Sequence, residues 1–271
     1  MKDQQYLNVQ YKLNEIEHKY GPHVHILNEP YLSKILATFC VAETKQPRIN
    51  FLVKILYSQL LSFIISAEFP RKLEKVSTRM IHYNKQAQFE AELLDVSVPV
   101  VSCAIARAGV LPSQVCYETL NTFFDSDKVR QDFIYLAREV NENQEVIGAC
   151  VSGHKIGGPI EGAYILIPDP MGATGGTVKK AIELYKECIS GTAKKVISLH
   201  LIMTPEYIKN VTREHPDVHV YALRLDRGLS SQRALNTIPG TYIEEEKGLN
   251  EKDYIIPGAG GIGEILNNSF V

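Results

Sequence analysis

The chain has 271 residues, a length that suits one α/β domain with additions or at most two domains. Apolar residues make up 45% of it and charged residues 22%, and these fractions exclude collagen-like, coiled-coil and wholly disordered chains. The net charge is −2 and no block of basic residues stands out, so no nucleic-acid partner is predicted.

The most apolar stretch, 52–65, is interrupted by Lys54, Ser58, Gln59 and Ser62. It falls short of the roughly 18 apolar residues that span a bilayer, so no membrane contact is predicted. The first residues lack the apolar core of a secretory signal, and the five cysteines include no C-x-x-C pair. A cytoplasmic protein with reduced thiols is therefore expected.

The first 95 residues predict a mainly helical region. Apolar residues recur at spacings of three and four over 31–42 and 49–67, as they do on the buried face of a helix. From residue 98 onward, short β-branched runs alternate with helical patterns. An amphipathic helix is predicted over 178–189. We predict strands over 98–103, 133–137, 164–167, 196–202 and 218–221.

This alternation predicts an α/β fold with a mostly parallel sheet flanked by helices. The helical region 1–95 is expected to pack on a core formed by 96–271, so that 1–271 is a single domain. Ligands of such sheets bind at the carboxyl ends of the strands, which is where chemistry is expected.

One segment combines several features of an anion site. It reads P-D-P-M-G-A-T-G-G-T from Pro168 to Thr177 and follows the strand predicted at 164–167, so Asp169 stands at a carboxyl end. Its glycines let the backbone close around a phosphate, and the helix start that follows offers unpaired N–H groups. Thr174 and Thr177 add hydroxyl donors. An isolated T-G-G would fit a plain helix N-cap equally well, but the whole string favours the phosphate site.

A strand, an acid and A-T-G-G-T opening a helix together resemble the phosphoribosyl-diphosphate-binding signature of type I phosphoribosyltransferases. The D-P-M in place of two adjacent acids resembles the uracil phosphoribosyltransferase family in particular. Four further stretches are similar to motifs of that family, namely I-A-R-A-G at 105–109, A-R-E at 137–139, G-H-K-I-G at 153–157 and G-L-N-E-K-D-Y-I-I-P-G at 248–258. The resemblance covers the chain from residue 98 to its end and the helical region only vaguely. It implies a type I phosphoribosyltransferase-like core with a C-terminal base-binding hood.

The resemblance also implies roles for individual residues. Arg107 and Arg138 would donate to the diphosphate and Asp169 would hold the ribose hydroxyls, and these three are the expected catalytic residues. The turn at 174–177 would hold the 5′-phosphate. The peptide bond between residues 106 and 107 is expected to be cis. The expected substrate-binding residues are Lys155, Pro170, Met171, Gly172, Ala173, Thr174, Gly175, Gly176, Thr177, Tyr254, Ile255, Gly260, Gly261 and Ile262.

The expected partners are small molecules. Phosphoribosyl diphosphate and uracil, or another base, are the substrates, and the base is expected to be read by backbone groups at Ile255 and Gly260. Mg²⁺ is the expected cofactor, bound mainly through substrate oxygens and water, so no protein metal site is predicted. The resemblance further implies a homodimer.

The sequence departs from the family at two places. Gly261 stands where the family has an acid that faces the substrates, and the nearest replacements are Glu264 and Asp253. Residues 231–247 form an apparent insertion beside the base site, either a lid, a partner surface or a solvated excursion.

Two other patterns have simpler interpretations. The three glutamates at 244–246 predict a solvated face. His23 and His25 would suit two metal ligands on one strand face, but ordinary exposed histidines are favoured because the sequence shows no further ligand cluster nearby.

The leading hypothesis is a pentosyltransferase of pyrimidine salvage that converts uracil and phosphoribosyl diphosphate to UMP and diphosphate. Two alternatives stay open. One is a nucleotide-sensing or regulatory paralogue with reduced catalysis, which Gly261 would allow. The other is a phosphoribosyltransferase for another base, which the altered stretch 260–262 and the insertion would allow.

Overall fold

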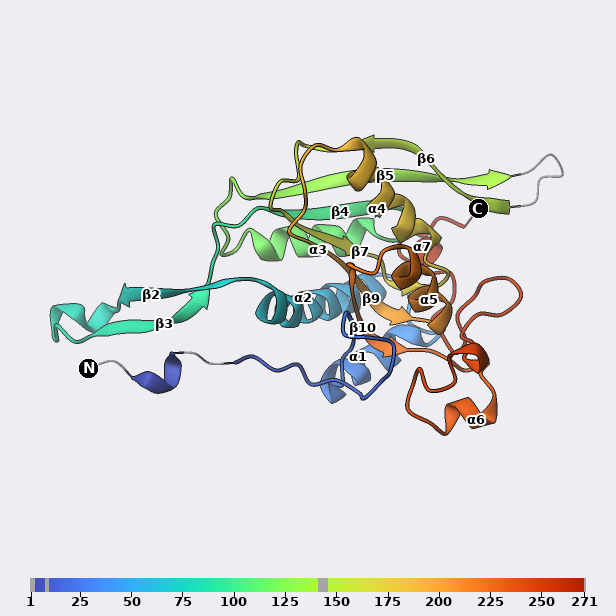
Figure 1. Cartoon of the computed structure of the whole chain (residues 1–271), viewed down its shortest axis with the longest axis horizontal. Helices are drawn as coiled ribbons and strands as arrows, with labels where there is room; N and C mark the ends of the chain where they lie inside the picture. Colours follow the sequence, from blue (N-terminus) through green and yellow to red (C-terminus); the bar gives the residue numbers. More distant parts are fainter. Residues whose placement is uncertain (1–2, 8–9, 141–145, 271) are drawn as a thin grey trace.

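The computed structural model describes residues 3–7, 10–140 and 146–270, and of 137–140 and 146–149 it describes the backbone alone. The central sheet has eight strands (Figure 1). They are β1 (Val24–Ile26), β4 (Val100–Ala106), β5 (Val129–Val140), β6 (Val146–Lys155), β7 (Tyr164–Pro168), β8 (Met171–Gly172), β9 (Lys195–Met203) and β10 (His219–Leu225).

The strand order is β1-β10-β9-β7-β4-β5-β6, and β8 pairs with β9 beside this path. Neighbouring strands are parallel along the order from β1 to β5, and β6 runs antiparallel to its neighbour β5. Every residue of β7 is buried, as expected of a central parallel strand covered on both faces. The predicted mostly parallel sheet is therefore confirmed, and so are all five predicted strands.

Helices cover both faces of the sheet and bury one apolar cluster on each side. On one face lie α1 (Pro30–Cys40), α2 (Arg48–Glu68) and α3 (Val110–Leu120), and on the other lie α4 (Gly176–Cys188) and α5 (Pro205–Glu214). Shorter elements are η1 (Gln4–Tyr6), η2 (Arg79–His82), α6 (Gln232–Leu235), η3 (Ile243–Glu245) and α7 (Ile262–Ile265).

By length and composition alone, α2 is apolar enough to cross a membrane. Half of its most apolar window is buried inside the molecule, however, and nine of its side chains belong to the core cluster between the sheet, α1 and α3. Tyr57, for example, is fully buried and its hydroxyl donates to the carbonyl of Leu199 in β9 at 3.2 Å. In this structure α2 is thus a core helix of the α/β fold.

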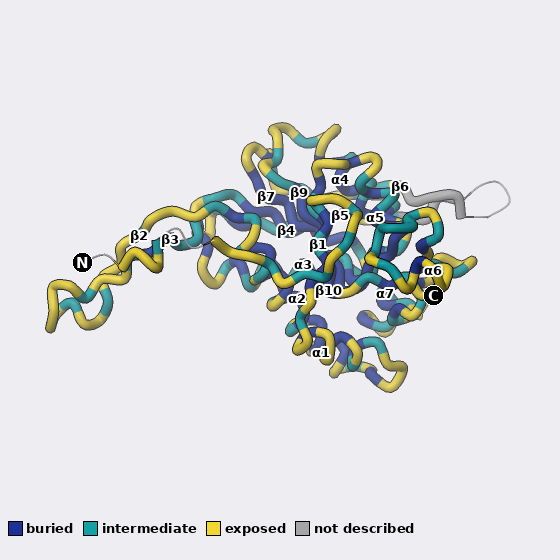
Figure 2. The backbone as a smooth tube through the Cα atoms, turned by 60° about the horizontal axis from the view of Figure 1, so that its bottom comes forward, coloured by how far each residue is buried: buried dark blue, intermediate teal, exposed yellow. Residues whose placement is uncertain are grey.

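The prediction that residues 1–95 are mainly helical is wrong in part. The two helices are present, but β1 joins the edge of the main sheet, and β2 (Arg71–Ser77) pairs with β3 (Gln88–Leu94) in a two-stranded arm. The arm projects from the body and most of its residues are exposed (Figures 1 and 2). β1 is only three residues long, and the arm of β2 and β3 has no buried face. Neither therefore shows the alternation of apolar and polar residues from which a strand is predicted.

The insertion at 231–247 is built around a buried ion pair. The Glu246 carboxylate is fully buried and accepts from Nη1 of Arg227 at 2.9 Å and from the N–H of Gly240. The second guanidinium nitrogen donates to the carbonyl of Thr237 at 2.8 Å. The expectation of a solvated face at 244–246 is therefore wrong for Glu246, because this carboxylate closes the inserted loop on Arg227.

Candidate functional site

Asp169 directly follows β7, between two prolines. Its N–H donates to the carbonyl of Leu199 and its Oδ1 accepts from the N–H of Met171, each at 3.1 Å. Its carbonyl oxygen accepts from Nδ1 of His200 at 2.6 Å. Burial lowers the pKa of His200 to about 4, so this ring is the neutral donor. Desolvation raises the pKa of Asp169 to about 6, and the hydrogen bond from Met171 opposes that shift.

The glycine-rich turn lies between β8 and α4. Gly175 has φ of +86°, and a Cβ there would lie 2.8 Å from Cγ2 of Val211 in α5, so both backbone and packing require glycine. Asn210 Nδ2 donates to the carbonyl of Thr174 at 2.9 Å. The turn, Asp169 and the start of α4 share a small cavity of about 50 Å³, lined by Asp169, Met171, Ala173, Thr174, Gly175, Thr177, Val178 and Tyr207.

The arginine turn follows β4, the strand beside β7. The peptide bond between Ala106 and Arg107 is cis, as predicted. Gly109 is buried, and a Cβ on it would lie 2.8 Å from the carbonyl oxygens of Ile105 and Pro168. Glycine therefore lets this turn rest directly on the end of the strand that precedes the candidate acid.

Arg107 itself is exposed and contacts the C-terminal segment. Its Nη1 donates to Oγ of Ser269 at 2.7 Å and to the carbonyl of the same residue at 3.2 Å. The guanidinium expected to bind diphosphate thus has an internal hydrogen-bond partner in this state.

Residues 248–258, here called the base loop because the resemblance implies that they bind the base, form a closed loop. Leu249 and Ile255 pair in an isolated antiparallel bridge, and Asn250 Oδ1 accepts two N–H groups of the same loop at 3.0 Å each. Ile255 is buried in the core and anchors the loop. Asp253 has φ of +59°, in the left-handed region. Aspartate tolerates this conformation better than most residues, so it is compatible with the turn.

Two acids that were not predicted from the sequence hold this loop against α5 and the end of β10. Glu206, in the first turn of α5, accepts from the N–H of Gly248 at 2.9 Å and of Leu249 at 3.2 Å. Asp226 is buried and accepts from the N–H of Gly258 at 2.8 Å. Asp226 directly follows β10, so the signal that singled out Asp169, an acid immediately after a strand, was present there as well.

The C-terminal motif packs on the arginine turn through α7. A Cβ on Gly263 would lie 3.5 Å from the Cβ of Ala108. A Cβ on Gly261 would lie 3.0 Å from Oε2 of Glu264, so the Glu264 carboxylate stands beside the position from which the family's acid would extend. Asp253, the other candidate replacement, is exposed in the turn of the base loop.

The structure does not bring every predicted residue together. Lys155 ends β6 in register with Phe133 of β5, and three strand spacings of about 4.8 Å place it on the order of 14 Å from β7. It is exposed there, and its assignment as a substrate-binding residue stays a prediction. The backbone of Arg138 lies in β5, but its side chain is outside the described part of the structure.

The other predicted binding residues cluster around the glycine-rich turn and the base loop. The buried ones are Pro170, Gly172, Gly175, Ile255 and Ile262, the partly buried ones are Met171, Ala173, Gly176, Thr177 and Gly261, and the exposed ones are Thr174, Tyr254 and Gly260.

Two adjacent parallel strands thus end in an arginine turn and an acid, beside a glycine-rich turn that opens a helix. This combination defines a phosphoribosyltransferase. The chain belongs to the uracil phosphoribosyltransferase family, because the sequence model described as "Uracil phosphoribosyltransferase" matches residues 26–242. The match extends through α1 and α2, where the sequence resemblance was only vague, and ends before the base loop.

Individual relatives carry the same family name, at low sequence identity to this chain. Proteins named uracil phosphoribosyltransferase are 28% identical over 169 residues in Mycoplasma capricolum, 38% over 102 residues in Clostridium botulinum and 26% over 246 residues in Campylobacter jejuni. These alignments cover 62%, 38% and 91% of this chain and 66%, 38% and 98% of the relatives. The chain therefore aligns with less than two thirds of the Mycoplasma and Clostridium proteins.

A solved structure supports the fold. The AQ2163 protein from Aquifex aeolicus superposes with a TM-score of 0.65 at 22% identity, over 90% of this chain and 97% of that one.

Proposed function

We propose that this phosphoribosyltransferase transfers the phosphoribosyl group of phosphoribosyl diphosphate to uracil, releasing UMP and diphosphate. The observation that carries the proposal is the convergence of three motifs far apart in sequence. Gly109 of the arginine turn packs on Pro168, which precedes Asp169, and α7 of the C-terminal motif packs on Ala108. The arginine turn, the acid and the C-terminal motif thus lie together at the carboxyl ends of β4 and β7.

The reaction makes specific demands on these residues. Attack on the anomeric carbon passes through an oxocarbenium-like transition state while diphosphate leaves, so fixed positive charge at the leaving group accelerates it. Arg107 supplies that charge once its guanidinium turns from Ser269 to the diphosphate. The Asp169 carboxylate accepts hydrogen bonds from the ribose hydroxyls, and the N–H groups at the start of α4 donate to the 5′-phosphate. The base loop binds uracil through the backbone at Ile255 and Gly260.

Mg²⁺ fits the donor set. Asp169 lines the cavity beside the glycine-rich turn and offers a partly buried carboxylate there, and a single carboxylate suits an ion held mainly by substrate oxygens and water. When bound with the substrate, Mg²⁺ supplies charge neutralisation on the diphosphate. A nearby cation also favours the ionised form of Asp169, whose desolvation favours the neutral form.

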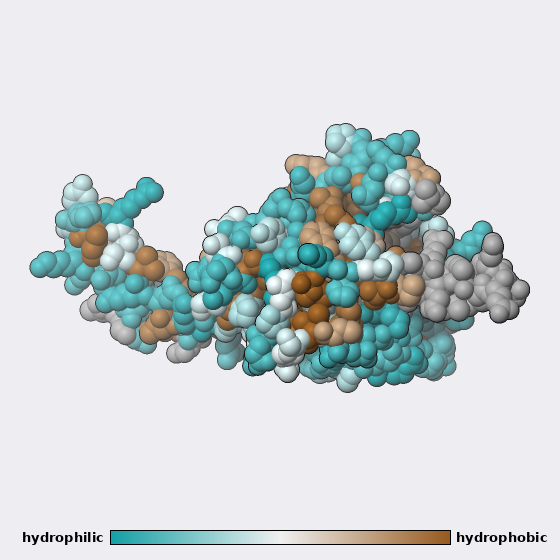
Figure 3. Space-filling view, turned by 90° about the horizontal axis from the view of Figure 1, so that it is seen from above, coloured by the Kyte–Doolittle hydropathy of each residue, from teal (hydrophilic) through white to brown (hydrophobic). Residues whose placement is uncertain are grey.

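A cytoplasmic homodimer is part of the proposal. The arm formed by β2 and β3 exposes several large apolar side chains, and separate patches of brown atoms lie on it in Figure 3. These side chains are Leu73, Val76, Met80, Tyr83 and Phe89. Exposed apolar groups gathered on a projecting hairpin are typical of a surface that a partner covers, and a second copy is the simplest partner.

The test is diphosphate release from phosphoribosyl diphosphate and Mg²⁺ with uracil, other pyrimidines and purines supplied in parallel. The proposal predicts release with uracil and UMP as the product. Release with another base alone would identify a sister transferase. No release with any base, together with thermal stabilisation by phosphoribosyl diphosphate or UMP, would identify a nucleotide-sensing protein.

Glu264 is the proposed replacement for the family acid lost at Gly261, because its carboxylate is beside that position. Glu264→Gln is expected to lower kcat at least about 10-fold while the Kd for phosphoribosyl diphosphate changes less than about 3-fold, since an amide keeps shape but not charge. Asp253→Asn is the matched control and is expected to leave both constants unchanged. The opposite pattern would assign the role to Asp253.

A further inference from the structure

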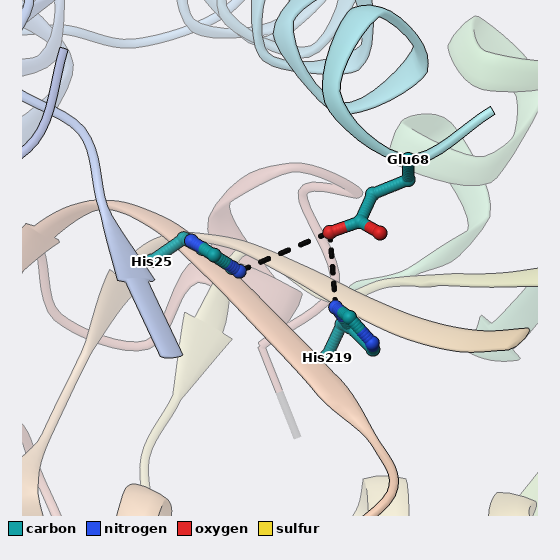
Figure 4. Close-up of side chains that lie close together, drawn as sticks. All are labelled: His25, Glu68 and His219. Carbon is teal, nitrogen blue, oxygen red and sulfur yellow. Dashed lines mark hydrogen bonds and ion pairs between the residues drawn. The ribbon is translucent and has the colours of Figure 1, made fainter. Parts of the chain in front are cut away.

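A cluster of histidines and one glutamate lies away from the transferase site. His25 of β1, His219 at the start of β10 and Glu68 at the end of α2 converge between the sheet edge and the helix (Figure 4). Each offers one ligand atom, and the three atoms lie within 4.8 Å of one another. Glu68 Oε1 is 2.9 Å from Nδ1 of His219 and 3.8 Å from Nε2 of His25.

The cluster has the surroundings of a metal site. Nδ1 of His25 lies 2.9 Å from a carboxylate oxygen of Glu15, which orients the ring so that Nε2 faces Glu68. A histidine held by a carboxylate on one nitrogen, with the other nitrogen facing further ligands, is the usual second shell of a metal-bound imidazole.

We infer that His25, Glu68 and His219 bind a divalent transition-metal ion, with Zn²⁺ as the best match. Two imidazoles and one carboxylate are an established zinc ligand set that leaves a fourth position for water. The side chains are only 16%, 6% and 15% exposed, so the site is enclosed but reachable from solvent. Ligand atoms of a tetrahedral site with bonds of about 2.0–2.1 Å lie roughly 3.3 Å apart. The 2.9 Å distance must widen and the 3.8 Å distance must shorten, each by about half an ångström or less, to reach that spacing.

The alternative is a hydrogen-bond network without metal. Glu68 also accepts from Lys195 on its Oε2 and from the hydroxyl of Tyr221 on its Oε1. Hydrogen bonds from its partners hold the pKa of Glu68 at about 2, although desolvation acts against them. Lys195 can remain on Oε2 when a metal ion takes Oε1, whereas the Tyr221 hydroxyl and Nδ1 of His219 must give up their hydrogen bonds to Oε1.

The role of the metal is structural. The seven residues of β10 at about 3.3 Å each place His219 roughly 20 Å from the carboxyl end of the strand, where the transferase site lies. The ion instead joins three elements, of which β1 is a short edge strand of three residues. Binding to the folded state alone would raise stability with metal concentration.

The experiment uses the full-length chain, stripped with EDTA and titrated with ZnCl₂ by calorimetry and with CoCl₂ by visible absorption. One Zn²⁺ per chain, a tetrahedral Co²⁺ spectrum and a rise in Tm are expected. His25→Gln and His219→Gln should each weaken binding at least about 100-fold, and Glu15→Gln about 10- to 100-fold. His82→Gln, at an exposed histidine of the arm, is the matched control and should bind as the unaltered chain does.

Binding by the unaltered chain weaker than about 100 μM, or binding that survives both histidine substitutions, would overturn the inference and leave a hydrogen-bond network. Circular dichroism of each variant in EDTA verifies folding. If a variant fails to fold, zinc-edge X-ray absorption on the unaltered chain decides, because the inference requires two imidazole nitrogens at the ion. A spectrum without imidazole scattering would contradict it.

Discussion

Replacing Asp169 by asparagine is expected to abolish turnover and to stabilise the free protein. Desolvation raises the pKa of this carboxyl from 3.8 to about 6. Between these two pH values the folded state therefore holds a proton that the unfolded state has released. The part of the unfolding free energy that comes from this proton is fully present below pH 3.8 and is lost as the pH rises through 6. The full difference of about 2 pKa units corresponds to roughly 3 kcal/mol at pH 8, and to about 1.5 kcal/mol at pH 5. Asparagine keeps an acceptor for the Met171 N–H and carries no charge to desolvate.

The assay is urea unfolding of the unaltered chain and Asp169→Asn at pH 5 and pH 8. The stability gained by the variant should grow by about 1.5 kcal/mol between the two pH values, because other titrating groups cancel in the difference. Asp125→Asn, which removes a carboxylate at an exposed position, is the matched control. A gain for Asp169→Asn that is equal at both pH values would refute the assignment of a desolvated carboxylate.

Three further substitutions test particular contacts. Gly109→Ala places a methyl group 2.8 Å from two carbonyl oxygens, so we expect a loss of about 1–3 kcal/mol in unfolding free energy and a raised KM for phosphoribosyl diphosphate, measured by denaturation and initial rates. Ser269→Ala removes the 2.7 Å hydrogen bond that Arg107 donates to the Ser269 hydroxyl. Because this bond competes with the diphosphate for Arg107, the Kd for phosphoribosyl diphosphate should fall about 2- to 5-fold by calorimetry. A higher Kd would contradict that competition. Arg227→Met leaves Glu246 buried without its cation and should cost about 3 kcal/mol in urea unfolding, and a loss below about 1 kcal/mol would contradict a structural pair.

The sequence was most informative where one element carries its own pattern. β7 and α4 could be predicted because a run of buried residues and an amphipathic helix are both local signals. The arm of β2 and β3 could not, since its strands have no buried face and their pairing is visible only in the register, as between Val76 and Phe89. β1 is held by the neighbouring strand rather than by its own three residues.

The same distinction applies to the candidate site. Asp169 and the glycine-rich turn were found because they are contiguous in sequence. The support of the base loop by Glu206 was missed because its partners lie more than 40 residues away and nothing near α5 marks them. The histidine cluster was missed for the same reason, since Glu68 and His219 approach His25 only when the sheet forms.

The most direct measurement of the central claim is uracil-dependent formation of UMP by the purified chain, with phosphoribosyl diphosphate and Mg²⁺ supplied and the product identified by mass. Turnover by the unaltered chain, abolished in Asp169→Asn and retained in Asp125→Asn, is predicted. Absence of UMP from a folded chain that binds phosphoribosyl diphosphate, or equal turnover in Asp169→Asn, would contradict the account.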